Sequence, residues 1–195
     1  MTATITRIAK LSAFLYSGII GLLVLASPKY SAFSVHPIAM ALALSSMLTA
    51  ILSFDKKTGA RKDKKETHIS FVICTFVFLI IGFVAILVAH KGLHFRSIHS
   101  KTGIVALLCA FMQVLSGYAA SKYRVRWLWR LHHMSGIATF LMMAGVSLLN
   151  ILPNRSWIAK HFEPDIANAA ITILGISIVG MLAAIASKPK YWIRK

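Results

Sequence analysis

The sequence predicts an all-α membrane protein with six transmembrane helices. Of its 195 residues, 57% are hydrophobic and only 14% are charged, and the mean hydropathy is +0.73. This composition lies outside the usual balance of a soluble domain. Six stretches without Asp, Glu, Lys or Arg are each long enough to cross about 30 Å of hydrocarbon at about 1.5 Å per helical residue. Because lipid offers no partner to unpaired peptide groups, each stretch is expected to be a helix.

The six helices leave almost no sequence for a soluble domain, so residues 1–195 are expected to form a single transmembrane domain. Charged residues bound the uncharged stretches, in order Lys10 and Lys29, Lys29 and Asp55, Glu66 and Lys91, Lys101 and Lys122, Arg130 and Arg155, and Asp165 and Lys188. The helices are expected at about 11–28, 34–54, 67–90, 99–121, 131–153 and 166–187. The first lacks a clear small-residue cleavage site and is taken as an uncleaved anchor.

The distribution of Lys and Arg predicts the orientation of the chain. Sixteen of the 22 lie at the amino end, in the loops after the second and fourth helices, and in the tail; six lie on the other side. The positive-inside rule then places both termini in the cytoplasm. The net charge of +17 is divided among short basic segments at the ends of the apolar helices. Membrane topology and binding of anionic lipid therefore explain this charge better than binding of nucleic acid does.

Four histidines, His36, His68, His99 and His132, each open a different helix near its first residues. Because successive helices cross in opposite directions, His36 and His99 are expected at the outer face, and His68 and His132 at the inner face. Ionisable side chains at such depths are costly and usually mark a pathway or a cofactor. Two imidazoles from facing helices can hold a haem iron from opposite sides.

These histidines predict a four-helix core, helices two to five, that holds two haems, with helices one and six as flanks. No CxxCH attachment sequence is present, so the haems would be of the non-covalent b type. Glycine follows two of the histidines at the same HxxxG spacing, at Gly103 and Gly136. A missing side chain one turn along the same face would leave room for a porphyrin edge.

The tandem His132 and His133 requires a choice, because consecutive helical residues point about 100° apart. The HxxxG spacing selects His132. The other histidines, His90, His94 and His161, lie in or beside outer loops, where a solvated side chain is the simplest interpretation. Cys74 and Cys109 fall inside helices and are interpreted as packing residues.

A histidine-lined transporter or channel for metal ions or protons is the alternative. The six uncharged stretches contain no Asp or Glu, whereas a cation or proton path usually has carboxylates along its length. An electron carrier is therefore favoured over a transporter.

The chain resembles the cytochrome b561 family of ascorbate-dependent transmembrane electron transferases. The matching motifs cover helices two to five, in the order His36-Pro37-Ile38-Ala39-Met40, a basic run ending in His68, His94-Phe95-Arg96-Ser97-Ile98-His99-Ser100 with Gly103, and His132 with Gly136. The resemblance is to the compact branch of the family. Helices one and six match only as apolar flanks.

The resemblance implies a six-helix protein, often a dimer, with two b haems, taking electrons from cytosolic ascorbate to monodehydroascorbate or a ferric chelate across the membrane. It implies that His36, His68, His99 and His132 are the axial ligands. The basic residues that it implies as contacts for cytosolic ascorbate are Lys64, Lys65, Arg124, Arg126 and Arg130. The outer substrate histidine of the family corresponds in place to His90 or His94.

Overall fold

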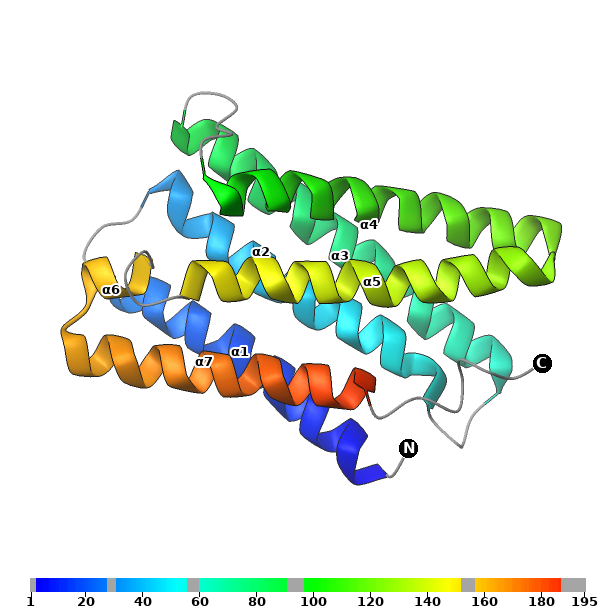
Figure 1. Ribbon diagram of the computed structural model, residues 1–195, viewed down its shortest axis with the longest axis horizontal. Coiled ribbons are helices and arrows are strands. Elements are labelled where there is room, and N and C mark those ends of the chain that lie inside the picture. Colours follow the sequence, from blue (N-terminus) through cyan, green and yellow to red (C-terminus); the bar gives the residue numbers. More distant parts are fainter. Residues whose placement is uncertain (1–2, 28–30, 56–59, 91–96, 152–156, 187–195) are drawn as a thin grey trace.

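The computed structural model describes residues 3–27, 31–55, 60–90, 97–151 and 157–186, and nearly all of them are helical (Figure 1). The helices are α1 (Ala3–Ala26), α2 (Ala32–Leu52), α3 (Arg61–His90), α4 (Ile98–Tyr123), α5 (Arg126–Ile151), α6 (Trp157–His161) and α7 (Pro164–Ala186), with the 3₁₀ turn η1 (Ser53–Asp55) after α2. Within these residues, six helices, all but α6, are long and apolar enough to cross a membrane. The all-α membrane fold is thereby confirmed.

Several helices extend beyond the expected apolar stretches. The structure starts α1 at Ala3 instead of near residue 11, α3 at Arg61 instead of near residue 67, and α5 at Arg126 instead of near residue 131. The apolar stretch measures only the part of a helix that fits inside hydrocarbon. The additional turns carry basic residues and are suited to the headgroup region. The short α6 was not expected from the apolar pattern.

The helices pack mainly in pairs, α2 against α3, α4 against α5, and α1 against α7. In Figure 1, α4 and α5 run side by side along most of their lengths. The most buried of the central helices is α2, whose buried face includes Ala39, Ala43 and Ala50. Small residues allow two helices to approach closely in lipid, where apolar burial alone gives little driving force.

The pair α2 and α3 touches the pair α4 and α5 only sparsely, although α3 and α4 are consecutive in the chain. Much of the outer surface of α3 and α4 consists of exposed apolar side chains such as Ile73, Val84, Leu108 and Met112. This surface is suited to hydrocarbon. The space between the two pairs contains the side chains described next.

The ends of α4 are defined by local signals. Ser97 is the N-cap, and its Oγ accepts a hydrogen bond from the backbone N–H of Ser100 at 3.0 Å. This cap places His99 in the first turn. At the other end Arg124 adopts the left-handed conformation, with φ of 55°, and its N–H donates to the Ala120 carbonyl. That conformation ends the helix and turns the chain into α5.

Candidate cofactor site

The structure brings the four helix-opening histidines together as two pairs. In the pair that the sequence predicts at the outer face, His36 of α2 and His99 of α4, the ring centroids are 6.3 Å apart and the ring planes are inclined by 86°, and we call it the outer pair and the other one the inner pair. In the inner pair, His68 of α3 and His132 of α5, the centroids are 6.0 Å apart and the planes are inclined by 84°. All four side chains are half-buried. Each pair joins one helix of α2 and α3 to one helix of α4 and α5.

Three of the four histidines are oriented by a backbone carbonyl of the adjacent helix. Nδ1 of His36 lies 2.9 Å from the Gly82 carbonyl oxygen of α3, and Nδ1 of His68 lies 2.9 Å from the Ala50 carbonyl oxygen of α2. Nδ1 of His99 lies 3.2 Å from the carbonyl oxygen of Val146 in α5.

A carbonyl oxygen only accepts hydrogen bonds, so Nδ1 of each of these three rings carries the proton and donates. The lone pair of the ring is then on Nε2. Histidines that bind metals in proteins almost always donate their other ring N–H to such an acceptor, which fixes both the tautomer and the ring orientation. The three rings are therefore prepared for ligation through Nε2.

The spacing within each pair suits one iron between two imidazoles. Metal–imidazole bonds are about 2 Å long, and with the ring radius added on each side the centroids of two opposed imidazoles lie about 6 Å apart. The observed centroid distances of 6.3 Å and 6.0 Å fit this arrangement. The donor set, two neutral imidazoles without a carboxylate, is one that b haems use.

An apolar cavity of about 340 Å³ adjoins the outer pair. Its volume falls within the range of about 300–1,000 Å³ that is typical of ligand pockets. His36 and His99 line it, together with Gly103 of α4, Tyr16 of α1 and Trp157 of α6. Apolar walls with a few convergent polar groups are what a porphyrin with two nitrogen ligands requires.

Gly103 lines the same cavity as His99, as the HxxxG spacing predicted. Gly136 does not act in this way, and that prediction was wrong. A Cβ at Gly136 would collide with the side-chain amide of Gln113 in α4. The glycine that makes room for the His132 ring is Gly117 of α4, where a Cβ would lie 2.8 Å from a ring carbon of His132.

The remaining histidines that the structure describes, His90, His133 and His161, are not members of the two pairs. His133 is exposed, whereas its neighbour His132 faces His68. His90, at the end of α3, is exposed and lines the outer cavity. The Nδ1 of His161 hydrogen-bonds the Trp157 carbonyl within α6, and His94 lies outside the described residues.

The basic residues expected to contact a donor lie at the end of the molecule that holds the inner pair. Lys64 and Lys65 belong to the first turns of α3, four and three residues before His68, and Arg126 and Arg130 belong to the first turns of α5. We call these four residues, with Arg124, the cationic collar. Lys65 reaches across to α4, where its Nζ donates to Oγ of Ser121 at 3.2 Å.

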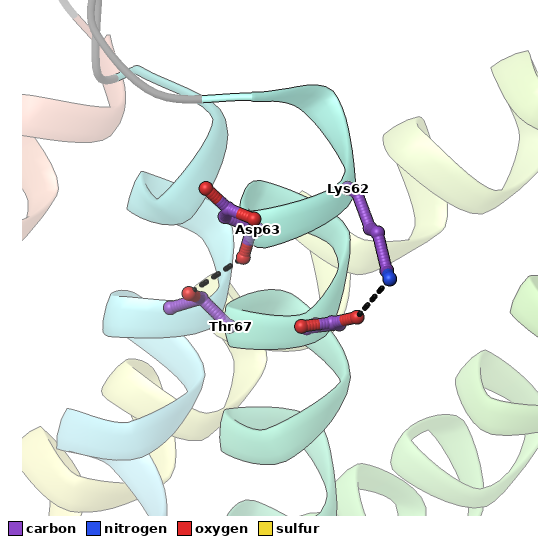
Figure 2. A network of polar contacts seen from close by, with 4 residues as sticks. Lys62, Asp63 and Thr67 are labelled. Atoms are coloured by element: carbon purple, nitrogen blue, oxygen red, sulfur yellow. Dashed lines mark hydrogen bonds and ion pairs between the residues drawn. The ribbon is translucent and has the colours of Figure 1, made fainter.

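Polar groups near the start of α3 contact one another within the helix (Figure 2). Lys62 forms an exposed ion pair of 4.0 Å with Glu66, and the Thr67 hydroxyl donates to the Asp63 carbonyl oxygen. Within the collar, Lys64 is half-buried, and the other four residues are exposed. The collar is therefore accessible to an anion from the aqueous phase.

Sequence reasoning missed two residues that shape the pairs. The carbonyl oxygen of Gly82 accepts from His36, and the missing side chain allows α2 to approach α3, since a Cβ there would overlap the end of the Met40 side chain and lie 3.2 Å from Cβ of Ala39. Gln113 contacts His132 from α4. Both residues could have been noticed in the sequence, because Gly82 is an isolated glycine in an apolar helix and Gln113 is the one side-chain amide of its helix.

Among the residues that the structure describes, no three His, Cys, Asp or Glu side chains form a group that could hold a metal ion.

Comparison with known proteins identifies a family and a relative of this chain. The model of the family described as eukaryotic cytochrome b561 matches residues 35–158, which include all four paired histidines. The transmembrane reductase CYB561D2 of Bos taurus is 30% identical over 142 residues, which are 65% of this chain and 63% of the bovine protein. The match therefore spans slightly less than two thirds of that relative.

Proposed function

This chain belongs to the cytochrome b561 family, and we propose that it carries electrons across a membrane from cytosolic ascorbate to a non-cytoplasmic acceptor. Membership of the family implies b-type haem. We propose two haems, held non-covalently, with His36 and His99 as the outer ligands and His68 and His132 as the inner ligands. The acceptor would be monodehydroascorbate or a ferric chelate, which makes the protein an oxidoreductase.

The observation that carries this proposal is the orientation of the paired imidazoles. Two rings about 6 Å apart occur twice, at opposite ends of the same four helices. Three of the four are held through Nδ1 by a backbone carbonyl, which leaves Nε2 for iron. Histidines that served only to form hydrogen bonds within the helix bundle would not be expected to lie in two pairs at this distance.

When bound, the haems would supply one-electron chemistry near both faces of the membrane. The protein's own residues would hold, orient and shield them. The apolar walls of the outer cavity would keep water from the ligand bonds, and the carbonyl contacts would keep each ring in one tautomer.

The cationic collar supports an anionic donor at the inner end. Ascorbate is an anion at neutral pH, and Lys64 and Lys65 lie within one turn of His68, while Arg130 lies within one turn of His132. A field of one sign raises the local concentration of an oppositely charged small molecule and its rate of association. At the other end of the molecule, His90 of α3 lines the outer cavity, and it is our candidate contact for the acceptor.

The proposal is tested first by the haem content of the purified protein. We expect two haems per chain, both reduced by ascorbate in the optical spectrum. In liposomes loaded with ascorbate, the wild type should reduce an external ferric chelate, and a His36→Ala variant should not. If ascorbate reduced neither haem of correctly oriented protein, a different donor would have to replace it; if no haem were bound, the electron-transfer function itself would fail.

A further inference from the structure

One polar side chain reaches the outer cavity from α1, a helix that the sequence predicted only as a flank. Tyr16 is 5% exposed and lines the cavity together with Ile20, about one turn further along α1. Both residues lie outside residues 35–158, over which the family model matches. The wall of the outer cavity therefore includes a helix that does not belong to the predicted four-helix core.

The hydroxyl group of Tyr16 hydrogen-bonds the side chain of Ser147 in α5, which lines the same cavity. Oγ of Ser147 also donates to the Met143 carbonyl oxygen, at 3.0 Å, within its own helix. A serine hydroxyl has one hydrogen to donate, so Ser147 accepts from Tyr16 and the phenol hydroxyl is the donor. The contact ties α1 to α5 at the cavity wall.

Ser147 directly follows the residue that orients His99. The carbonyl oxygen of Val146 lies 3.2 Å from Nδ1 of His99, compared with 2.9 Å in the other two carbonyl contacts of the paired histidines. A backbone carbonyl can orient a ring only if its own turn of helix is held in place. This turn lies near the end of α5 at Ile151, and helix ends fray. The contact with Tyr16 holds the turn from outside α5.

We propose that Tyr16 and Ser147 are positioning residues of the outer haem site, through which α1 fixes the turn of α5 that orients His99. The proposal rests on the proposed function, in which His99 is an axial ligand. Loss of a group that orients a metal ligand typically weakens metal binding by about 10–100-fold. Tyr16 acts one step behind the Val146 carbonyl, so we expect an effect at the lower end of this range.

The next residue of α1 offers a matched comparison. Oγ of Ser17 lies 2.6 Å from Oγ of Ser45 and 3.3 Å from the Ala41 carbonyl oxygen, both on α2. Ser17→Ala therefore also removes a hydroxyl contact between α1 and a neighbouring helix, but it leaves the contact between α1 and α5 in place. This variant separates a general loosening of α1 from an effect on the turn that orients His99.

The test compares wild type with Tyr16→Phe, Ser147→Ala, the double variant and Ser17→Ala, all as purified haem-loaded protein. The first readout is the rate at which the outer haem, identified by its absence from His36→Ala, is lost to an excess of apomyoglobin. Tyr16→Phe and Ser147→Ala should each lose the outer haem about tenfold faster than wild type, and the inner haem at the wild-type rate. Because both changes break the same contact, the double variant should be no faster than the faster single variant. Ser17→Ala should resemble wild type.

The second readout is the electron paramagnetic resonance spectrum of the oxidised protein. Its g values depend on the angle between the two imidazole planes of each ferric haem. A turned His99 ring should shift the outer signal in Tyr16→Phe and in Ser147→Ala and leave the inner signal unchanged. A variant that was merely less stable would not show this shift.

Three results would overturn the proposal and leave the two-haem function intact: unchanged haem loss and an unchanged outer signal in Tyr16→Phe, additive effects in the double variant, or an equal effect of Ser17→Ala. If Tyr16→Phe were purified without its outer haem, the proposal would stand only if Ser17→Ala kept both haems and Ser147→Ala lost the outer one faster than wild type. A wild type that binds no haem, or a His99→Ala variant that keeps the outer haem, would instead contradict the proposed function.

Discussion

The Gly82 carbonyl oxygen of α3 accepts a hydrogen bond from Nδ1 of His36 at 2.9 Å. The contact depends on the close approach of α2 to α3, because a Cβ at Gly82 would overlap Met40 and press on Ala39. Gly82 thus provides the hydrogen-bond acceptor for His36 and also permits the close approach of α2 to α3.

Replacing Gly82 with Val should remove the outer haem and spare the inner haem. The added side chain would force α2 away from α3 and withdraw the carbonyl from His36, at a cost of about 1–3 kcal/mol in stability, as is usual for overpacking. Haem content and the thermal stability of the detergent-solubilised protein measure both effects. Gly145→Ala is the matched control, since a Cβ there would meet no atom within 4 Å. Equal loss of haem in both variants would contradict the role of Gly82.

Substitution of His132 and substitution of His133 should have different effects on haem binding. His132 faces His68 with ring centroids 6.0 Å apart, whereas His133 is exposed. We expect His132→Ala to lose or severely perturb the inner haem and keep the outer one, and His133→Ala to keep both, as judged by haem analysis and optical spectra. Retention of the inner haem in His132→Ala with its loss in His133→Ala would reverse the assignment.

Neutralising part of the cationic collar should slow reduction by ascorbate. A variant with Lys64→Gln, Lys65→Gln and Arg126→Gln would lose three of the five positive charges, and we expect a decrease of about tenfold or more in the rate at low salt. The difference from wild type should shrink as salt shortens the screening length from about 10 Å at 0.1 M to about 3 Å at 1 M. Stopped-flow absorbance measures the rate, and the haem spectra should not change.

Lys62→Gln is the control for the collar, since Lys62 lies on the same helical turns but is paired with Glu66 at 4.0 Å. Its rate should stay close to that of wild type. A triple variant with an unchanged rate would show that these charges set only the topology of the chain.

The orientation of the chain is tested by labelling. In a protein whose Cys74 and Cys109 have been replaced, new cysteines at Lys62 and Lys160 occupy exposed positions at opposite ends of the bundle. With the protein in the surface membrane of sealed cells, an impermeant thiol reagent should label position 160 from outside and position 62 only after permeabilisation. The reverse pattern would invert the topology and place the collar on the outer face.

The apolar stretches predicted the number of membrane helices and their order correctly, because each helix in lipid must pair its own backbone groups. The ends were less well predicted. Since α1, α3 and α5 continue for several residues past the uncharged stretch, hydropathy reports where hydrocarbon begins and not where the helix begins. The grouping of His36 with His99 and of His68 with His132 also followed from the sequence, because each crossing reverses the direction of the chain.

The sequence by itself therefore determined the fold class, the depth of the four histidines and the membrane face of each relative to the others. Only the tertiary structure decided what each ring touches. The spacing of His132 and Gly136 suggested a space beside the histidine, yet Gly136 makes room for Gln113, and Gly117 of the neighbouring helix makes room for His132. A missing side chain leaves space for whatever the adjacent helix presents, and the rotation of one helix against another follows from packing along their whole length.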